Sequence, residues 1–184
     1  MSKFARGFKT HCEEIVTSVR EELGLPEQHP INMAKFAQRL EIPLVPFADH
    51  VQASGLTCDR VHVEEIYLKI SAFTVFEGRR RTVVYNDRHA RPRHRSNLAH
   101  EFAHALLLHP PEGCAGSSAQ ERLHEDEAAW LGGVLLLTDR QALAAARLPA
   151  DLAITQYEIS REMLIYRLNV TAASKRARLG GLAA

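Results

Sequence analysis

The feature that most constrains this chain is the pentapeptide His100-Glu-Phe-Ala-His104, which lies in a run rich in Ala and Leu that meets no Gly or Pro before Pro110. Such a run favours a helix, and residues four apart lie on the same face of a helix. Both imidazoles then point the same way and can bind one metal ion. Glu101 is close enough to accept a proton from a water on that ion.

Zinc suits this pattern because it binds imidazole nitrogens and carboxylate oxygens in a tetrahedron, and catalytic zinc sites leave one position open. We therefore expect Zn²⁺ as the cofactor. The pentapeptide also arises by chance, in helices whose histidines only pack or face solvent. The apolar surroundings favour metal binding, because imidazoles in an apolar helix are costly to bury without partners.

A third protein ligand is expected from the next helix, over residues 120–137, which carries several carboxylates. Glu125 is the first choice, because it shares a helix face with small and apolar residues that can pack against the preceding helix. Glu127, on a different face, is the second choice. The alternative interpretation makes these carboxylates an acidic first turn that complements the helix dipole.

Two other histidines lie close to these helices in the sequence. His109 is expected at the end of the pentapeptide helix as a residue that can carry positive charge, with a contact supporting the metal site as the alternative. His124 is expected on the surface, with a role as a ligand or transition-state donor as the alternative. The residue that stabilises the oxyanion is not identified, and the candidates are His124, Tyr157 and Tyr166.

The 184 residues suggest one domain, or one domain with a small appendage. A net charge of +1 gives no overall field that favours nucleic acid or membranes. The three cysteines fall outside any C-x-x-C pair, which fits a reducing compartment and argues against a disulfide framework and a cysteine zinc knuckle: Cys12, Cys58 and Cys114. Without a signal-peptide pattern or a membrane-spanning apolar run, we expect a cytoplasmic protein with no membrane partner.

Two segments rich in β-branched and aromatic residues, 70–76 and 81–85, flank a Glu-Gly-Arg turn and predict a β-hairpin. Prolines limit residues 42–46 to at most an edge strand. Residues 47–66 are weakly patterned, and we expect a loop there with an irregular strand near 61–63. Apolar periodicity and terminal signals predict four helices before residue 138, over residues 4–23, 32–40, 92–109 and 120–137.

Short helices are predicted beyond that point, over residues 140–148, 150–157 and 161–168. The spacing of the last two is similar to that of helix-turn-helix modules. Packing in a helical bundle produces the same pattern, and this interpretation is favoured over direct DNA binding. The arginines between residues 79 and 95 are interpreted as a solvated rim, with an acidic-substrate or nucleic-acid patch as the alternative.

Taken together, these segments resemble the ImmA/IrrE family of zinc metallo-endopeptidases. The resemblance rests on five segments: Arg6-Gly-Phe-Lys9, Glu22-Leu-Gly-Leu25, Val83-Val-Tyr-Asn86, Leu98-Ala-His-Glu-Phe-Ala-His-Ala-Leu-Leu-Leu108 and Glu125-Asp-Glu-Ala-Ala129 with Leu135-Leu-Leu137. It implies an α+β fold with a small antiparallel sheet packed on the pentapeptide helix. Residues 1–138 would form a zincin-like metallopeptidase domain, and residues 139–184 a helix-turn-helix-like C-terminal helical region.

The resemblance also implies roles for residues and a substrate. The zinc ligands would be His100, His104 and Glu125. Glu101 would be the catalytic base. Family members typically cleave a helix-turn-helix transcriptional repressor, so the expected partner is such a repressor, controlling a mobile element or a stress response. The family often has Asn where Ala129 stands, which bears on metal affinity because residues around the ligands tune it. It also often ends this helix with Met-Pro, where this chain has Thr-Asp.

Two other classes of function remain open. In a non-catalytic regulator the metal would be structural or absent, and the C-terminal helices would bind DNA or a repressor. Structural zinc is usually closed by four protein ligands, so a fourth ligand from His109 or His124 would favour that class. A hydrolase of small peptides or other amide bonds would have a narrow, closed pocket in place of an open groove.

Overall fold

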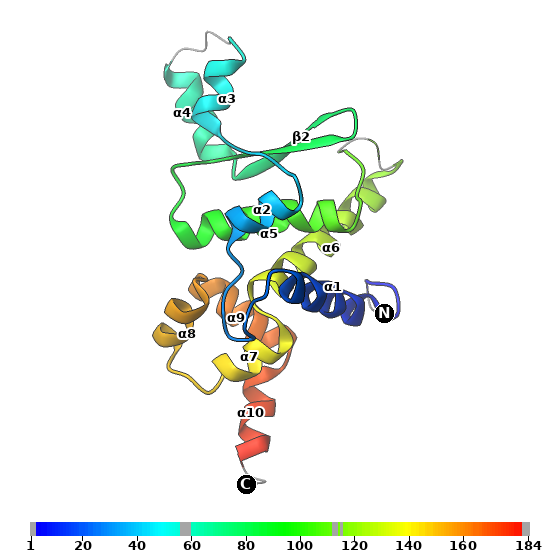
Figure 1. Ribbon diagram of the computed structural model, residues 1–184, viewed down its shortest axis with the longest axis vertical. Helices are drawn as coiled ribbons and strands as arrows, with labels where there is room; N and C mark the ends of the chain where they lie inside the picture. Colours follow the sequence, from blue (N-terminus) through cyan, green and yellow to red (C-terminus); the bar gives the residue numbers. More distant parts are fainter. Residues whose placement is uncertain (1–2, 56–59, 112–113, 115, 182–184) are drawn as a thin grey trace.

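The computed structural model describes residues 3–55, 60–111, 114 and 116–181. The elements follow in the order α1 (Phe8–Glu22), α2 (Met33–Arg39), β1 (Leu44–Pro46), α3 (Phe47–Ala53), α4 (Arg60–Lys69), β2 (Ala72–Glu77), β3 (Arg80–Tyr85), α5 (Arg91–Leu106), α6 (Ser118–Leu136), α7 (Asp139–Ala145), α8 (Ala150–Tyr157), α9 (Arg161–Val170) and α10 (Ala173–Gly181). The molecule is elongated, with the sheet, α3 and α4 at one end, α7 to α10 at the other, and α5 and α6 between them (Figure 1). The fold is therefore α+β, as expected.

The sheet has three strands in the order β1-β3-β2, and it is mixed, whereas the resemblance implied an antiparallel sheet. The predicted hairpin is confirmed, since β2 runs antiparallel to β3. The predicted edge strand is confirmed as well, because β1 pairs in parallel with β3, placing Leu44 opposite Val83. Successive side chains of β3 enter opposite faces of the sheet. Val83 joins the main core, whereas Val84 joins a small core with Phe47 and Tyr67. Burial on both faces explains why β3 is central.

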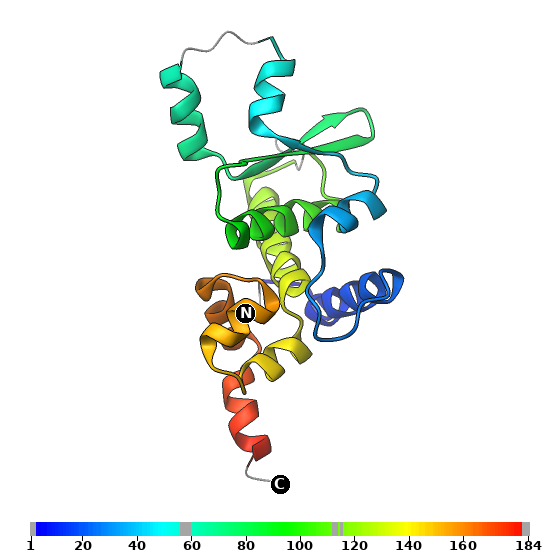
Figure 2. The same ribbon diagram turned by 60° about the vertical axis from the view of Figure 1, so that its left-hand side comes forward.

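The prediction for residues 47–66 is wrong, because this stretch contains α3 and most of α4 in place of a loop and a strand. Both helices lie on the side of the sheet opposite α5 (Figure 2). Ile66, Tyr67 and Ile70 pack into the small core at helical spacing. Tertiary packing on the sheet thus overrides the strand preference of the β-branched residues near 61–63. Residues 56–59 lie outside the described part of the chain.

Helix α5 contacts the other face of the sheet and also packs against α6 and α2, and α1 packs against α6. The four helices predicted before residue 138 are confirmed to within a few residues. At the α2–α5 contact, the rings of Phe36 and Phe102 meet edge to face at 5.4 Å. Both side chains are fully buried. The helix that carries the pentapeptide is therefore packed between the sheet and the helices α2 and α6.

The C-terminal segment is helical, as predicted. A capping box formed by Thr138 and Gln141 starts α7, and Ser160 caps α9. The final helix, α10, was not predicted, since its basic and small residues have no clear apolar stripe. The apolar core continues from α6 into these helices through Tyr157 and Leu164. The division at residue 138 and the helix-turn-helix resemblance stay predictions. None of the helices in the described ranges has the length and apolar character needed to cross a bilayer.

Candidate metal centre

Helix α5 brings the two histidines of the pentapeptide together. The helix starts after Ala90, with Pro92 in its first turn, where the missing proline N–H leaves no helical hydrogen bond unmade. Its regular geometry then places the Nε2 atoms of His100 and His104 3.1 Å apart. Both imidazoles are partly buried, and Phe102 points into the core between them in sequence. The pair therefore has a fixed orientation.

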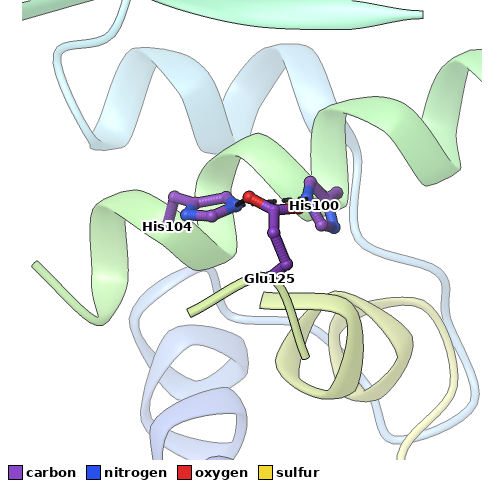
Figure 3. A group of neighbouring side chains, drawn as sticks. All are labelled: His100, His104 and Glu125. Carbon is purple, nitrogen blue, oxygen red and sulfur yellow. Dashed lines mark hydrogen bonds and ion pairs between the residues drawn. The ribbon is translucent and has the colours of Figure 1, made fainter. Parts of the chain in front are cut away.

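Helix α6 brings Glu125 to this pair. A Cβ atom at Gly132 would lie 3.2 Å from the backbone carbonyl of Ala99 and from the backbone nitrogen of His100, so a larger residue would have to move the two helices apart by a few tenths of an ångström. Two turns earlier on α6, the carboxylate of Glu125 lies between the imidazoles (Figure 3). Its oxygens are 3.1 Å from His100 Nε2 and 3.3 Å from His104 Nε2.

These ligand atoms fit a metal ion by their chemistry. One atom from each of His100, His104 and Glu125 lies within 4.8 Å of the others, and among the described residues this is the one group that could hold a metal ion. Burial, and after it the neighbouring His100 and His109, lowers the pKa of His104 to about 3. The imidazole is therefore neutral and keeps a lone pair, which is the form that binds metals. Two nitrogens and a carboxylate form a ligand set that zinc accepts.

Glu101 lies beside the ligands and faces strand β2. Its Oε2 accepts a hydrogen bond of 2.6 Å from the hydroxyl of Thr74. Burial raises the pKa of Glu101 above its ordinary value, while the bond from Thr74 opposes that rise. A carboxylate with a raised pKa is a better proton acceptor, as a general base requires. Sequence reasoning missed Thr74, because its contact with Glu101 depends on how the sheet lies on α5.

The expectation that His109 is a charged residue at the end of the helix is wrong. Its side chain is only 6% exposed, and burial, with the nearby His124, lowers its pKa to about 4, so the imidazole is neutral. Its Nδ1 lies 3.0 Å from His104 Nδ1 and its Nε2 lies 3.2 Å from an oxygen of Glu127. The structure thus favours the alternative, a contact supporting the metal site. Glu127, the second choice for a ligand, faces His109 and lies outside the metal-binding group.

The three candidate oxyanion donors separate clearly. His124 is half-buried, stacks on His109 with ring centroids 4.3 Å apart, and lines the cavity beside the metal centre. Tyr157 is fully buried, and its hydroxyl donates to Gln28, so it takes no part in this site. Tyr166 lines a different cavity, of 710 Å³, on another side of His100. Of the three, His124 is the one that lines the same cavity as Glu101.

The cavity at the metal centre has a volume of 480 Å³ and lies along strand β2. Its lining includes Ala72, Thr74 and Phe76 of the strand, together with the ligands and Glu101. Because β2 is at the edge of the sheet, this side of its backbone is open to pairing with an extended chain. The arrangement therefore brings a group that could hold a metal ion, the carboxylate of Glu101 and a strand edge around one space.

These features define a class, a mixed α and β protein with a two-helix metal centre. A family model described as the IrrE N-terminal-like domain, Peptidase_M78, matches residues 60–169, which is more than half of the chain. The chain belongs to this family of metallopeptidases, and the resemblance seen in the sequence is confirmed. The match runs from α4 through α9 and includes both helices of the metal centre. No curated protein matches the chain.

Proposed function

We propose that this protein is a zinc-dependent endopeptidase of the cytoplasm, and that it cleaves a helix-turn-helix transcriptional repressor of a mobile element or a stress response. The observation that carries the proposal is the convergence of three ligand atoms in the described structure, from His100, His104 and Glu125. Membership in a metallopeptidase family supports the same chemistry.

Bound zinc would supply an acidified water and a Lewis acid for the scissile carbonyl. Glu101 takes the proton from the attacking water and then delivers it to the leaving amine. The hydroxyl of Thr74 holds one oxygen of Glu101 at 2.6 Å, which leaves the other oxygen to exchange the proton. His124, which lines the same cavity, is the residue we assign to the developing oxyanion.

The substrate binds in an extended conformation along β2. The strand lies at the edge of the sheet and borders the cavity that contains the metal ligands. An extended segment added to such an edge gains main-chain hydrogen bonds, while alternate side chains enter pockets. A repressor would therefore be cut in a segment that can leave its own fold, such as a linker.

Two observations support an enzyme over a regulator with structural zinc. Such a regulator would use His109 or His124 as a fourth ligand. The two ring nitrogens of His109 contact His104 Nδ1 and Glu127, on the side of His104 away from the other ligands. Neither histidine belongs to the metal-binding group found among the described residues. A three-residue set leaves a coordination position for water, as catalytic zinc requires.

The test is cleavage of a repressor encoded beside this gene, followed by mass spectrometry with and without a chelator. Glu101→Gln keeps the size of the side chain and removes the base, so it should retain zinc and lower the rate by about 100- to 10,000-fold. Glu14→Gln, at an exposed carboxylate of α1, is the matched control and should cleave normally. Proteolysis retained by Glu101→Gln, or cleavage that resists the chelator, would contradict the proposal.

A further inference from the structure

The end of α5 folds His109 back onto the metal ligand His104. Leu107 closes the helix, and Leu108 adopts a left-handed conformation with φ of 56°. The backbone N–H of His109 then donates to the carbonyl of His104 at 3.0 Å, and that of Leu108 donates to Ala105 at 3.2 Å. These two bonds form a Schellman turn, which fixes the residue five positions after His104 beside it.

The side chains of His104, His109 and Glu127 form further hydrogen bonds, and the donor and acceptor of each can be assigned. His104 turns its Nε2 toward His100 and Glu125, so the metal-binding lone pair belongs on Nε2 and the proton on Nδ1. His104 Nδ1 is therefore a donor, and it lies 3.0 Å from His109 Nδ1. His109 must accept at Nδ1, and its own proton then lies on Nε2, 3.2 Å from the carboxylate of Glu127. With one tautomer of each imidazole, both hydrogen bonds of the chain His104–His109–Glu127 have a donor and an acceptor.

The middle member of this chain is held firmly. His109 is buried, and the guanidinium of Arg81 donates a bond of 2.9 Å to its backbone carbonyl. The ring of His124 stacks on its imidazole at an interplanar angle of 17°. Glu127 approaches from α6, the helix that also carries Glu125. The chain therefore joins both helices of the metal centre, on the far side of His104 from the ligand atoms.

We infer that Glu127 and His109 form a hydrogen-bonded chain that fixes His104 in its metal-binding tautomer and so sets the affinity of the centre for zinc. Both are positioning residues, since they act through His104. The half-buried carboxylate of Glu127 favours a proton on His109 Nε2, which leaves Nδ1 free to accept from His104. Partners of this kind around a metal ligand tune affinity by about 10- to 100-fold. The inference rests on the proposed metal centre.

The experiment measures the zinc dissociation constant by competition with a fluorescent chelator, for the full-length protein and four variants. His109→Gln keeps a carbonyl that can accept from His104 Nδ1, whereas His109→Leu keeps apolar volume and accepts nothing. We expect His109→Leu to bind zinc about 10- to 100-fold more weakly and His109→Gln to stay within about fivefold of the wild type. His11→Leu, at an exposed histidine of α1, is the matched control and should bind as the wild type does.

The order of the two variants separates positioning from packing. If His109 only filled space, the leucine variant would bind zinc as well as the glutamine variant does or better, and that result would overturn the inference. Glu127→Gln should weaken binding by an intermediate factor, because an amide oxygen can still accept from His109 without the charge. Thermal unfolding of each metal-free variant verifies that the affinities compare folded proteins.

Nitrogen-15 NMR of the histidine rings gives a second measurement, because it shows which ring nitrogen carries the proton. A role in packing alone would not fix that position. In the zinc-loaded protein His104 should carry its proton on Nδ1 and His109 on Nε2. A proton on His109 Nδ1 would overturn the inference even if zinc binds tightly. If the wild type fails to bind zinc at all, the proposed function fails as well. If the wild type and His109→Leu bind zinc equally tightly, the inference about His109 and Glu127 is wrong and the proposed function still stands.

Discussion

Two polar clusters in the described part of the protein differ in their hydrogen-bonding groups. At the metal centre, two imidazole nitrogens and a carboxylate meet around one point. Between α1, α6 and α9, the fully buried Arg167 donates to the carbonyl of Leu137 at 2.7 Å and to Glu13 at 3.1 Å. Glu13 also accepts from the backbone N–H of Asp139. In the second cluster each of these donors meets an acceptor, and a cation is already present.

The difference indicates what each cluster is for. A buried charge is stable in a fold only when it is paired and hydrogen-bonded, as Arg167 is by Glu13. Its guanidinium also lies over the ring of Trp130, at 5.7 Å from the centroid. The metal centre brings acceptors together without a comparable cation among the described residues, which is why we propose that a metal ion binds there. A buried guanidinium paired with a carboxylate thus marks the structural cluster, and convergent acceptors mark the candidate metal centre.

The largest effect should come from removing the cation of the structural cluster. Arg167→Leu leaves the half-buried Glu13 without its partner, and we expect a loss of about 3 kcal/mol in the free energy of unfolding. His104→Leu, at the metal centre, should change the stability of the metal-free protein far less, because it removes an acceptor that has no cation. Urea unfolding of metal-free samples compares the two variants.

Arg161→Leu is the matched control for that comparison. Arg161 lies on the same helix, α9, and forms an exposed ion pair with Asp151. Exposed pairs contribute about 1 kcal/mol or less. A loss at Arg161 equal to that at Arg167 would mean that burial and pairing do not distinguish the two arginines, and that the Arg167 cluster has no special structural role.

Zinc should raise the free energy of unfolding through the metal centre, and this gain should not depend on the Arg167 cluster. A ligand that binds only the folded state at 100 times its dissociation constant adds about 2.7 kcal/mol to the free energy of unfolding. We expect this gain in the wild type, its reversal by a chelator, and its absence in His104→Leu. Arg167→Leu should show the same gain from its lower starting point. Thermal unfolding with and without zinc measures each, and a gain retained by His104→Leu would contradict the ligand assignment.

Much of the site could be predicted from the sequence, because its signals are local. The spacing of His100 and His104 needs only a helix, and Gly132 on a small-residue face favours the close packing that brings Glu125 to them. The structure gathers these three side chains, while their roles as ligands stay predictions. The helices α3 and α4 escaped prediction, since their conformation depends on packing against the sheet.

The contacts of Glu101 and His104 with more distant residues could not be predicted for a related reason. Thr74 reaches Glu101 only through the strand register and the placement of the sheet on α5. His109 reaches His104 through a turn that usually has Gly at its left-handed position, whereas this chain has Leu108 there. A search for the glycine signal would therefore miss the turn and leave His109 as a terminal charge.

The buried, neutral His109 beside the metal centre should make the stability of the protein sensitive to acid. The pKa of His109 is about 4 in the folded protein against an ordinary value of 6.5, so between these pH values the unfolded chain binds more protons. Stability of the metal-free protein should therefore fall as pH drops from 6.5 toward 4. His109→Gln removes this titration and should lose about 1–2 kcal/mol less than the wild type over that range. Equal losses, measured by urea unfolding at several pH values, would contradict the buried neutral state of His109.

The smallest effect should come from two residues with positive φ, one beside each cluster. Leu108 follows α5 with φ of 56°, and Ala172 lies between α9 and α10 with φ of 53°. Such conformations cost an L-residue about 1 kcal/mol, and glycine avoids that cost while adding entropy to the unfolded chain. Leu108→Gly and Ala172→Gly should each raise the free energy of unfolding by about 0.5 kcal/mol.

The comparison between these two glycine variants isolates the turn at the metal centre. The side chain of Leu108 is 81% exposed, so its removal sacrifices little apolar burial, and Ala172 has only a methyl group to lose. Zinc affinity should stay unchanged in both, because the backbone bonds of the turn remain. If Leu108→Gly stabilises the fold yet weakens zinc binding while Ala172→Gly does not, then the stiffness of the leucine turn itself holds His109 against His104.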